Sequence, residues 1–299
     1  MAIRTVGILH PGDMGHAVGA VLGSHGLRVV AALDERSERT RGLAAKAGIE
    51  DLGTLDRLVT EADLVLSILV PAAAEEQAEQ VATALRATGA QPLYADCNAI
   101  APAATVRIGE RITAAGGRYL DASIIGPPPR RPGTTRIYAS GAAASELAEL
   151  GSHCLEIRVL GTRIGQASGL KMCYGSLTKG LAALATSALV AAERLELDEP
   201  LRRELAESQP MLLDWFGTML PNMPPKAHRW VGEMEEIAAT LAAVGLTPRM
   251  LEGAAEMYRW VATTAPGQET PEQRQPRNLE QTIAALATRA DVATASGAV

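Results

Sequence analysis

A short apolar strand, residues 6–9, ends at a glycine-containing turn, and the chain then continues as a predicted helix. The turn reads His10-Pro11-Gly12-Asp13-Met14-Gly15. Gly12 lets the backbone turn without a Cβ atom, and Gly15 lets the helix pack closely against the strand. The first N–H groups of that helix can then bind a pyrophosphate. His10 replaces the first glycine of the usual G-x-G-x-x-G pattern, but strand, turn and helix follow in the right order. The turn therefore predicts a dinucleotide-binding βαβ unit.

Charged residues about 20 positions beyond this turn are candidates for binding the adenosine ribose. The second predicted strand, residues 27–33, is followed by Asp34, Arg36 and Ser37. A carboxylate at the strand end binds the ribose diol of NAD and repels a 2′-phosphate, whereas a guanidinium beside a hydroxyl at a helix start binds phosphate. We expect NADP, with Asp34 turned away from Arg36 and Ser37. NAD, or a turn that is merely charged and solvated, is the alternative.

Lys171 is the strongest candidate for a catalytic residue. It lies one to two turns into a predicted helix that begins at Gly165 and is otherwise made of small and apolar residues. Burial in such surroundings lowers the pKa of an amine, which suits it to exchange a proton with an oxygen atom during hydride transfer. The structural alternative is a lysine that reaches solvent from the helix start.

Five segments, in the same order along the chain, resemble the β-hydroxyacid dehydrogenases. This family includes 3-hydroxyisobutyrate and 6-phosphogluconate dehydrogenases, with imine reductases as near relatives. The segments are the turn at 10–15, Val70-Pro71, Asp96-Cys97-Asn98-Ala99-Ile100-Ala101-Pro102, Asp121-Ala122-Ser123-Ile124-Ile125-Gly126-Pro127, and Lys171. The resemblance covers most of the chain and implies that Lys171 is the acid/base, since imine reductases usually have another residue there. It also implies that Asn98 and Ser123 position the substrate and that Leu69, Val70, Pro71 and Asn98 contact the cofactor.

The substrate loop departs from the family pattern. In the family, backbone N–H groups of Ser-Gly-Gly bind an acid group, but the matching residues here are Ile125-Gly126-Pro127, and proline has no N–H. A substrate carboxylate would need Arg130, Arg131 or Ser123 instead, and arginine offers the better geometry. The candidate substrate contacts are Ser123, Ile124, Gly126, Arg130 and Tyr174.

A second departure lies four residues after the lysine, where the family usually has Asn and this chain has Gly175. Tyr174, one position earlier, is a partial substitute. Together with His10, these departures resemble a less characterised branch whose C-terminal domain has no settled function.

Alternating strand and helix patterns extend to about residue 160. Strands are expected at 6–9, 27–33, 63–69, 92–96, 118–121, 136–139 and 156–160, with helices from Gly15, from Ser37, after Pro71 and after Pro102. This alternation predicts a parallel, doubly wound α/β sheet of the Rossmann type. We expect an NAD(P)-binding domain at residues 1–164 and an all-α substrate and dimerisation domain at residues 165–299.

The second domain should begin with one long helix, because residues 165–195 contain no proline and are apolar in every turn. Residues 181–192 are apolar on nearly every face, so this helix should be buried on every face, and one small domain can hardly enclose it. We therefore expect a homodimer, as the resemblance also implies. His228 and Arg229 are weak candidates for substrate contacts, within one subunit or across a dimer.

The composition favours a small-molecule ligand. The chain has 299 residues, 47% of them hydrophobic, and 28 basic against 34 acidic side chains with no basic block, so neither nucleic acid nor an anionic membrane is an expected partner. The cysteines, Cys97, Cys154 and Cys173, have no metal-ligand spacing, which predicts no metal site and a reducing compartment. The longest apolar stretch, near residues 180–192, is too short and alanine-rich for a membrane span, so a cytoplasmic protein is expected.

The sequence thus predicts an NADP-dependent oxidoreductase that transfers a hydride between nicotinamide C4 and a carbon that bears oxygen in a small hydroxy or keto substrate. An imine reductase is the alternative enzyme, favoured by an apolar pocket. A redox-silent protein that binds NADPH as a sensor is the alternative of another class.

Overall fold

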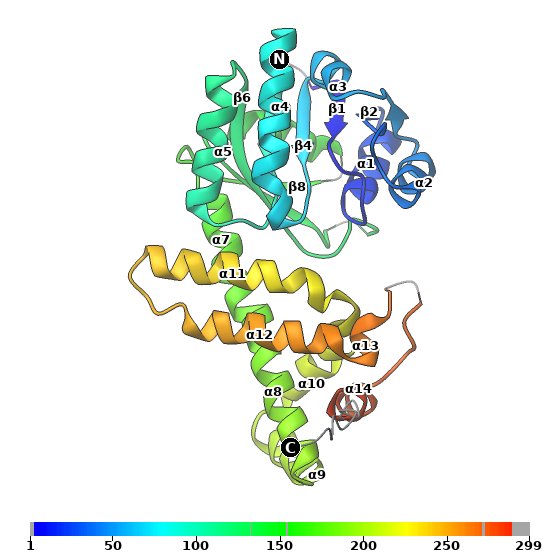
Figure 1. Cartoon of the computed structure of the whole chain (residues 1–299), viewed down its shortest axis with the longest axis vertical. Coiled ribbons are helices and arrows are strands. Elements are labelled where there is room, and N and C mark those ends of the chain that lie inside the picture. The colour runs from blue at the N-terminus through cyan, green and yellow to red at the C-terminus, as the bar shows by residue number, and fades with distance from the viewer. Residues whose placement is uncertain (1–2, 132, 154, 271–272, 289–299) are drawn as a thin grey trace, which may run out of the picture. The chain divides into compact units, whose positions relative to one another are not determined.

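Eight strands form one sheet within residues 3–131, 133–153, 155–270 and 273–288, which are the residues that the computed structural model describes (Figure 1). The strand order is β3-β2-β1-β4-β5-β6-β7-β8. Strands β1 to β6 pair in parallel, which is the order of a dinucleotide-binding doubly wound sheet. The strands are β1 (Thr5–Ile8), β2 (Arg28–Ala31), β3 (Glu50–Asp51), β4 (Leu64–Ser67), β5 (Leu93–Asp96), β6 (Arg118–Ile125), β7 (Arg136–Ser140) and β8 (Glu156–Gly161).

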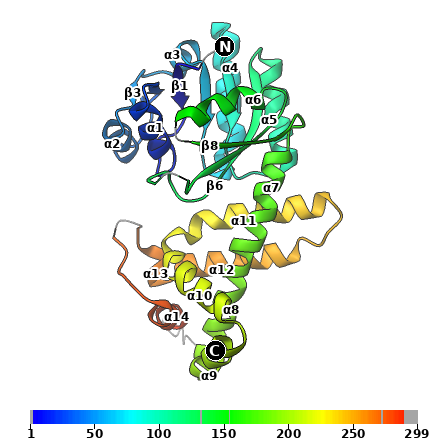
Figure 2. The ribbon, with the colours of Figure 1, turned by 180° about the vertical axis from the view of Figure 1, so that it is seen from behind.

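Helices cover both faces of this sheet, as Figures 1 and 2 show from opposite sides. Apolar side chains of one face pack against α1, α2 and α6, and those of the other face pack against α3, α4 and α5. The strands are apolar on both faces because both faces are buried. The helices of this part are α1 (Gly15–Ser24), α2 (Glu38–Lys46), α3 (Leu55–Glu61), α4 (Ala74–Thr88), α5 (Pro102–Ala114) and α6 (Ala144–Leu147), with 3-10 turns η1 (Pro71–Ala73) and η2 (Ala148–His153).

The expectation of a wholly parallel sheet is wrong at two strands, because β7 runs antiparallel to β6 and β8 runs parallel to β7. The described residues between β6 and β7 form no helix, whereas a parallel neighbour of β6 would need a longer crossover connection. The sequence patterns also missed β3 and α3. The predicted doubly wound α/β class is confirmed.

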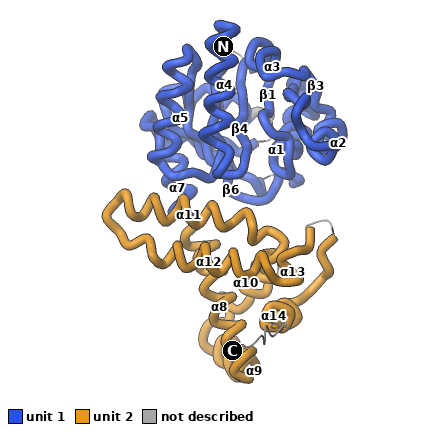
Figure 3. The backbone as a smooth tube through the Cα atoms, viewed as in Figure 1, with its two compact units in different colours: residues 1–174 blue, residues 175–299 orange. Residues whose placement is uncertain are grey.

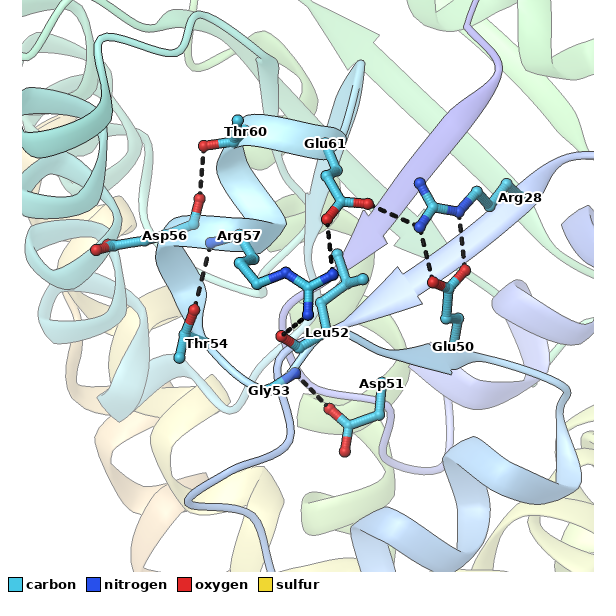
Figure 4. A network of polar contacts seen from close by, with 10 residues as sticks. All are labelled: Arg28, Glu50, Asp51, Leu52, Gly53, Thr54, Asp56, Arg57, Thr60 and Glu61. Atoms are coloured by element: carbon cyan, nitrogen blue, oxygen red, sulfur yellow. Dashed lines mark hydrogen bonds and ion pairs between the residues drawn. The ribbon is translucent and has the colours of Figure 1, made fainter.

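Ion pairs join the edge of the sheet at β3 to helix α3 (Figure 4). Arg28 pairs with Glu50 and with Glu61, each at 2.7 Å, and Arg57 pairs with Glu61 at 3.0 Å. These side chains are largely solvent-exposed, so each pair contributes little stability. Arg28 and Glu50 begin β2 and β3, so the network lies at the amino ends of these strands, opposite the edge where the glycine turn lies.

The chain divides into two compact units, unit 1 (Met1–Tyr174) and unit 2 (Gly175–Val299), shown in Figure 3. This division falls ten residues after the boundary that the sequence placed before Gly165. The reason is that helix α7 (Gln166–Gly175) begins against the sheet: the Asp121 carboxylate of β6 accepts hydrogen bonds from the N–H groups of Gly165, Ala167 and Ser168. The first turns of the long helix therefore belong to unit 1.

Unit 2 contains only helices and turns in its described residues. The predicted long helix is confirmed as the helical run Gln166–Arg194, which contains a π-helical turn, η3 (Ser176–Gly180). The Tyr258 hydroxyl donates to the Lys179 carbonyl of this turn at 2.6 Å, and Tyr258 also packs edge-on against Trp230. The further elements are α8 (Leu181–Arg194), α9 (Asp198–Ser208), α10 (Pro210–Met219), η4 (Leu220–Asn222), η5 (Pro224–Lys226), α11 (Ala227–Ala243), α12 (Arg249–Thr263), α13 (Ala265–Gln268) and α14 (Leu279–Ala287).

The run Gln166–Arg194 is long and apolar enough to cross a membrane by length and composition alone, a test that the core helix of a globular protein also passes. Its α8 segment packs against α12 and α14 and buries Leu189 and Val190, as a core helix does. Leu184 on the same helix is 66% exposed, so this unit by itself does not bury every face. A cytoplasmic location stays a prediction.

Candidate active site

The glycine turn connects β1 to α1 as predicted. A Cβ atom at Gly15 would lie 2.4 Å from the His10 carbonyl oxygen, so helix and strand can approach this closely only with glycine there. Gly12 differs from the expectation, because its φ angle is not positive and a Cβ atom there would meet only the His10 ring, at 3.2 Å. No side chain caps the start of α1. The turn therefore fits a pyrophosphate at the helix N-terminus.

The turn after β2 presents the residues expected at the 2′-position of the adenosine ribose. Ser37 caps α2, its hydroxyl accepting from the Thr40 N–H at 3.3 Å. Asp34 is exposed, and its carboxylate lies against Gly53 of the neighbouring turn, 3.2 Å from where a Cβ atom of that glycine would lie. The half-buried Arg36 donates to the Gln77 side chain of α4 at 2.9 Å. The Asp34 carboxylate thus lies toward Gly53, whereas the Arg36 guanidinium lies toward Gln77.

Further cations lie beside this turn. Arg39 pairs with Asp13 of the glycine turn at 2.6 Å, so one predicted cofactor residue forms an ion pair within the protein. Burial lowers the pKa of His10 below its usual value, and the positive charges of Arg36 and Arg39 lower it further. Arg36 and Arg39 thus place positive charge beside the glycine turn, which suits phosphate groups.

Asn98 is completely buried and both ends of its amide are bonded within the protein. Its Oδ1 accepts from the Leu69 N–H at 2.5 Å, and its Nδ2 donates to the Ser67 hydroxyl at 2.9 Å. Asn98 therefore holds the loop that contains Leu69, Val70 and Pro71, in which Val70 is half exposed. The geometry gives Asn98 the role of holding this loop and shows no amide group turned outward for a substrate.

A layer of buried polar groups underlies this loop. The Asp96 carboxylate accepts from the Asn98 N–H at 2.9 Å, while its Oδ2, the Tyr94 hydroxyl and the Ser123 hydroxyl are buried without a hydrogen-bond partner. Burial raises the pKa of Asp96 to about 7 against the lowering effect of the Asn98 N–H, and the nearby Asp121 carboxylate raises it further. Burial also raises the pKa of Cys97, which makes that thiol a poor nucleophile.

Lys171 lies at the carboxyl end of β6. Its Nζ donates to the Ile124 carbonyl, and its side chain is half-buried. Its positive charge lowers the pKa of the Cys97 thiol, which places the amine near the carboxyl end of β5 as well. The structure thus brings Lys171 to the Ile124 carbonyl, and the buried Ser123 of the predicted site is the preceding residue on β6. All lie in unit 1 with the glycine turn.

Asp121 lies in one of the motifs of the sequence, but the motif does not reveal its role in the fold. Its buried carboxylate accepts from three backbone N–H groups at the start of α7 and from the Ser140 hydroxyl at 2.8 Å. The available signal was the absence of a local capping residue, because Gly165 stands where Ser, Thr, Asp or Asn usually begins a helix.

Other candidates lie outside this group. Arg130 is exposed on the β6–β7 hairpin, where Gly126 has φ +120° and a Cβ atom would lie 2.1 Å from the Thr134 carbonyl oxygen. Tyr174 is 47% exposed at the end of unit 1. His228 and Arg229 belong to α11 of unit 2. Cys154 lies outside the described residues, and those described contain no cluster of His, Cys, Asp or Glu that could hold a metal.

Comparison with known families accounts for both units. Residues 5–157, more than half of the chain, match the NAD binding domain of 6-phosphogluconate dehydrogenase, and residues 192–261 match a domain of unknown function, DUF1932. A conserved hypothetical protein from Sinorhizobium meliloti 1021 is 25% identical, with 95% of this chain and 96% of that chain covered and a TM-score of 0.68.

Two further solved structures are similar. The conserved protein MTH1747, described as of unknown function and structurally similar to 3-hydroxyacid dehydrogenases, is 28% identical, with coverages of 86% and 96% and a TM-score of 0.67. The 3-hydroxyisobutyrate dehydrogenase of Mycobacterium tuberculosis is 19% identical, with coverages of 96% and 98% and a TM-score of 0.67, and imine reductases share the fold at lower TM-scores. The chain therefore belongs to the family that carries the NAD-binding domain of 6-phosphogluconate dehydrogenase, which supports an NAD(P) oxidoreductase.

Proposed function

We propose that this protein is an NADP-dependent dehydrogenase or reductase of small hydroxy or keto compounds, with Lys171 as its acid/base. The observation that carries the proposal is the position of Lys171. A half-buried amine is held at the Ile124 carbonyl, on the same edge of the sheet as the glycine turn. Ligands of doubly wound sheets bind at this edge.

The contact with Ile124 orients the amine for proton transfer. An ammonium group has three N–H donors, and a backbone carbonyl accepts one of them without cancelling the positive charge. When bound, the nicotinamide supplies the hydride. Lys171 then donates a proton to the substrate oxygen in the direction of reduction, or accepts that proton in the direction of oxidation. Ser123, buried with an unpartnered hydroxyl, is a second polar group on β6 for the substrate.

Three contacts support NADP over NAD. Ser37 caps α2 beside the proposed 2′-phosphate position, Arg36 precedes it in the chain, and the Asp34 carboxylate lies against Gly53. A carboxylate turned toward its neighbouring turn repels a 2′-phosphate less than one turned toward the ribose.

The test is a screen of NADPH and NADH consumption with ketoacids, semialdehydes, ketones and cyclic imines, with Lys171→Met as the control for chemistry. Turnover of carbonyl compounds that depends on Lys171 supports the proposal. Turnover of cyclic imines alone supports an imine reductase. Tight NADPH binding without turnover of any compound supports a redox-silent sensor.

We also propose a homodimer formed through α8. Leu184 and Leu195 are 66% and 67% exposed, and Ala188 and Ala191 between them are also exposed. These four residues follow the helical spacing i, i+4, i+7 and i+11, so they form one apolar stripe. A second copy of the chain would bury this stripe.

A further inference from the structure

Gln77 is a polar side chain on the buried face of α4. Its neighbours on that face are Ala74, Ala78 and Val81, and Gln77 itself is only 6% exposed. Burying an amide costs free energy unless both of its ends form hydrogen bonds. Here Oε1 accepts from Arg36 Nη2 at 2.9 Å and Nε2 donates to Gln80 Oε1 at 3.0 Å.

The direction of this amide follows from its partners. A guanidinium has only donors, so it requires the oxygen of Gln77, and the nitrogen is left to face Gln80. The bond to Arg36 spans 41 residues and joins helix α4 to the turn after β2. Arg36 is therefore held from outside its own turn.

The neighbouring arginines differ from Arg36 in their partners. Arg39 pairs with the Asp13 carboxylate, and Arg41 donates to the backbone carbonyls of Asp34, at 2.5 Å, and of Arg36, at 3.1 Å. In the described part of the chain, Arg36 forms no ion pair, and its side-chain hydrogen bond goes to a neutral acceptor. Gln77 therefore fixes this guanidinium while leaving its charge uncompensated.

We propose that Gln77 is a positioning residue that sets cofactor preference by holding the Arg36 guanidinium for a 2′-phosphate. This inference rests on the proposed function, in which Arg36 binds that phosphate. Without the amide, the long arginine side chain regains rotamer freedom that phosphate binding must remove again. A carboxylate in place of the amide would hold the guanidinium equally well but would compete with the phosphate for its charge.

The experiment measures the dissociation constants of NADPH, NADH, 2′,5′-ADP and 5′-AMP by calorimetry on the full chain. The variants are Gln77→Met, which keeps length without an acceptor, and Gln77→Glu, which adds charge at the same place. The matched control is Gln91→Glu, an exposed glutamine just before β5. Gln77→Met should weaken NADPH and 2′,5′-ADP by about 3- to 10-fold. Gln77→Glu should weaken them by about 10-fold or more. NADH and 5′-AMP should bind within about twofold of wild type, and the control should change nothing.

The outcomes separate this inference from the proposed function. Equal loss for all four ligands in the Gln77 variants would assign Gln77 a merely structural role and overturn the inference. A wild-type preference for NADPH that Arg36→Ala removes but both Gln77 variants retain would also overturn it, with the cofactor proposal intact. A wild type that binds NADPH and NADH equally would overturn the proposed NADP preference itself. Should Gln77→Met fail to fold, Gln77→Glu still carries the test, because it retains a hydrogen-bond acceptor.

Discussion

Asp121 and Ser168 are joined by two hydrogen bonds between fully buried groups. The Asp121 carboxylate accepts from the Ser168 hydroxyl at 2.6 Å and from the Ser168 N–H at 3.1 Å. Three residues after each of these partners, the same strand and helix meet again, where Lys171 donates to the Ile124 carbonyl. The strand that leads into the candidate substrate loop therefore also holds the helix that carries the candidate acid/base.

Ser168→Ala should destabilise unit 1 by about 1.5 to 3 kcal/mol, the typical contribution of a hydrogen bond to a charged group. The midpoint of urea unfolding measures this change. Ser187→Ala on α8 is the matched control, because that hydroxyl donates only to the Ala183 carbonyl within its own helix, at 3.0 Å. Equally small decreases in the free energy of unfolding of both variants would show that the Ser168–Asp121 hydrogen bonds do not stabilise unit 1.

Lys171→Met should lower kcat by about 100-fold or more, since a positioned acid or base contributes at least that much. The dissociation constant of the cofactor should stay within a few-fold of wild type. Lys46→Met, on the exposed end of α2, should leave both unchanged. Single-turnover hydride transfer at the wild-type rate in Lys171→Met would place Lys171 outside the chemistry.

Arg36→Ala should erode the preference for NADPH over NADH by about 1 to 3 kcal/mol, the scale of a charge-assisted hydrogen bond. Only the NADPH dissociation constant should rise. Arg107→Ala, an exposed arginine that pairs with Glu75, controls for the loss of one positive charge. Equal losses for both cofactors would show that Arg36 contacts something other than the 2′-phosphate.

Asp96 should make the protein less stable as the pH rises. Its pKa is about 7 in the folded chain against an ordinary value of 3.8, so between these values the folded state keeps a proton that the unfolded state has lost. The free energy of unfolding therefore falls as pH rises from about 4 to 7, and the loss is complete above the folded pKa. Asp96→Asn, whose Oδ1 can still accept from the Asn98 N–H, should flatten this dependence.

Urea unfolding of wild type and Asp96→Asn at pH 5 and pH 8 measures the difference. Relative to the wild type, the free energy of unfolding of Asp96→Asn should be higher at pH 8 than at pH 5. The exposed Asp56→Asn is the matched control and should follow wild type at both values. Parallel pH profiles of Asp96→Asn and wild type would refute an ionisation of Asp96 in this range.

Leu184→Asp should prevent dimerisation without unfolding unit 2, because this side chain is 66% exposed there. A stable dimer of this kind buries more than about 2,000 Å² of largely apolar surface, and a charge in its middle is strongly unfavourable. Light scattering at micromolar concentration should give a dimer for wild type and a monomer or aggregate for the variant. Leu189→Asp is a different experiment, since Leu189 is 4% exposed and its charge would unfold the unit itself.

Val106→Asp is the control for added charge, because Val106 is partly exposed on α5 of unit 1. This variant should have the same oligomeric state as the wild type. A wild-type chain that is a fully active monomer would contradict the dimer proposal. A monomer would also exclude a substrate contact of His228 or Arg229 across a dimer.

The sequence by itself determined the features that depend on neighbouring residues. Gly15 and the apolar strand before it predict the turn from β1 to α1, because close packing of helix on strand requires glycine at that position. Ser37 predicts the start of α2, where it caps the helix. The absence of proline from residues 165–195 predicts the long helix that carries Lys171. Each of these follows from backbone geometry within a few residues.

Only the tertiary structure decided which distant groups bond to one another. It turned the Asn98 amide toward Leu69 and Ser67, joined Arg36 to Gln77 across 41 residues, and placed Asp121 at the start of a helix more than 40 residues later. It also reversed β7, because a short hairpin replaced a crossover. A polar side chain must find partners wherever the fold buries it, and local sequence contains no record of which strand or helix will lie there.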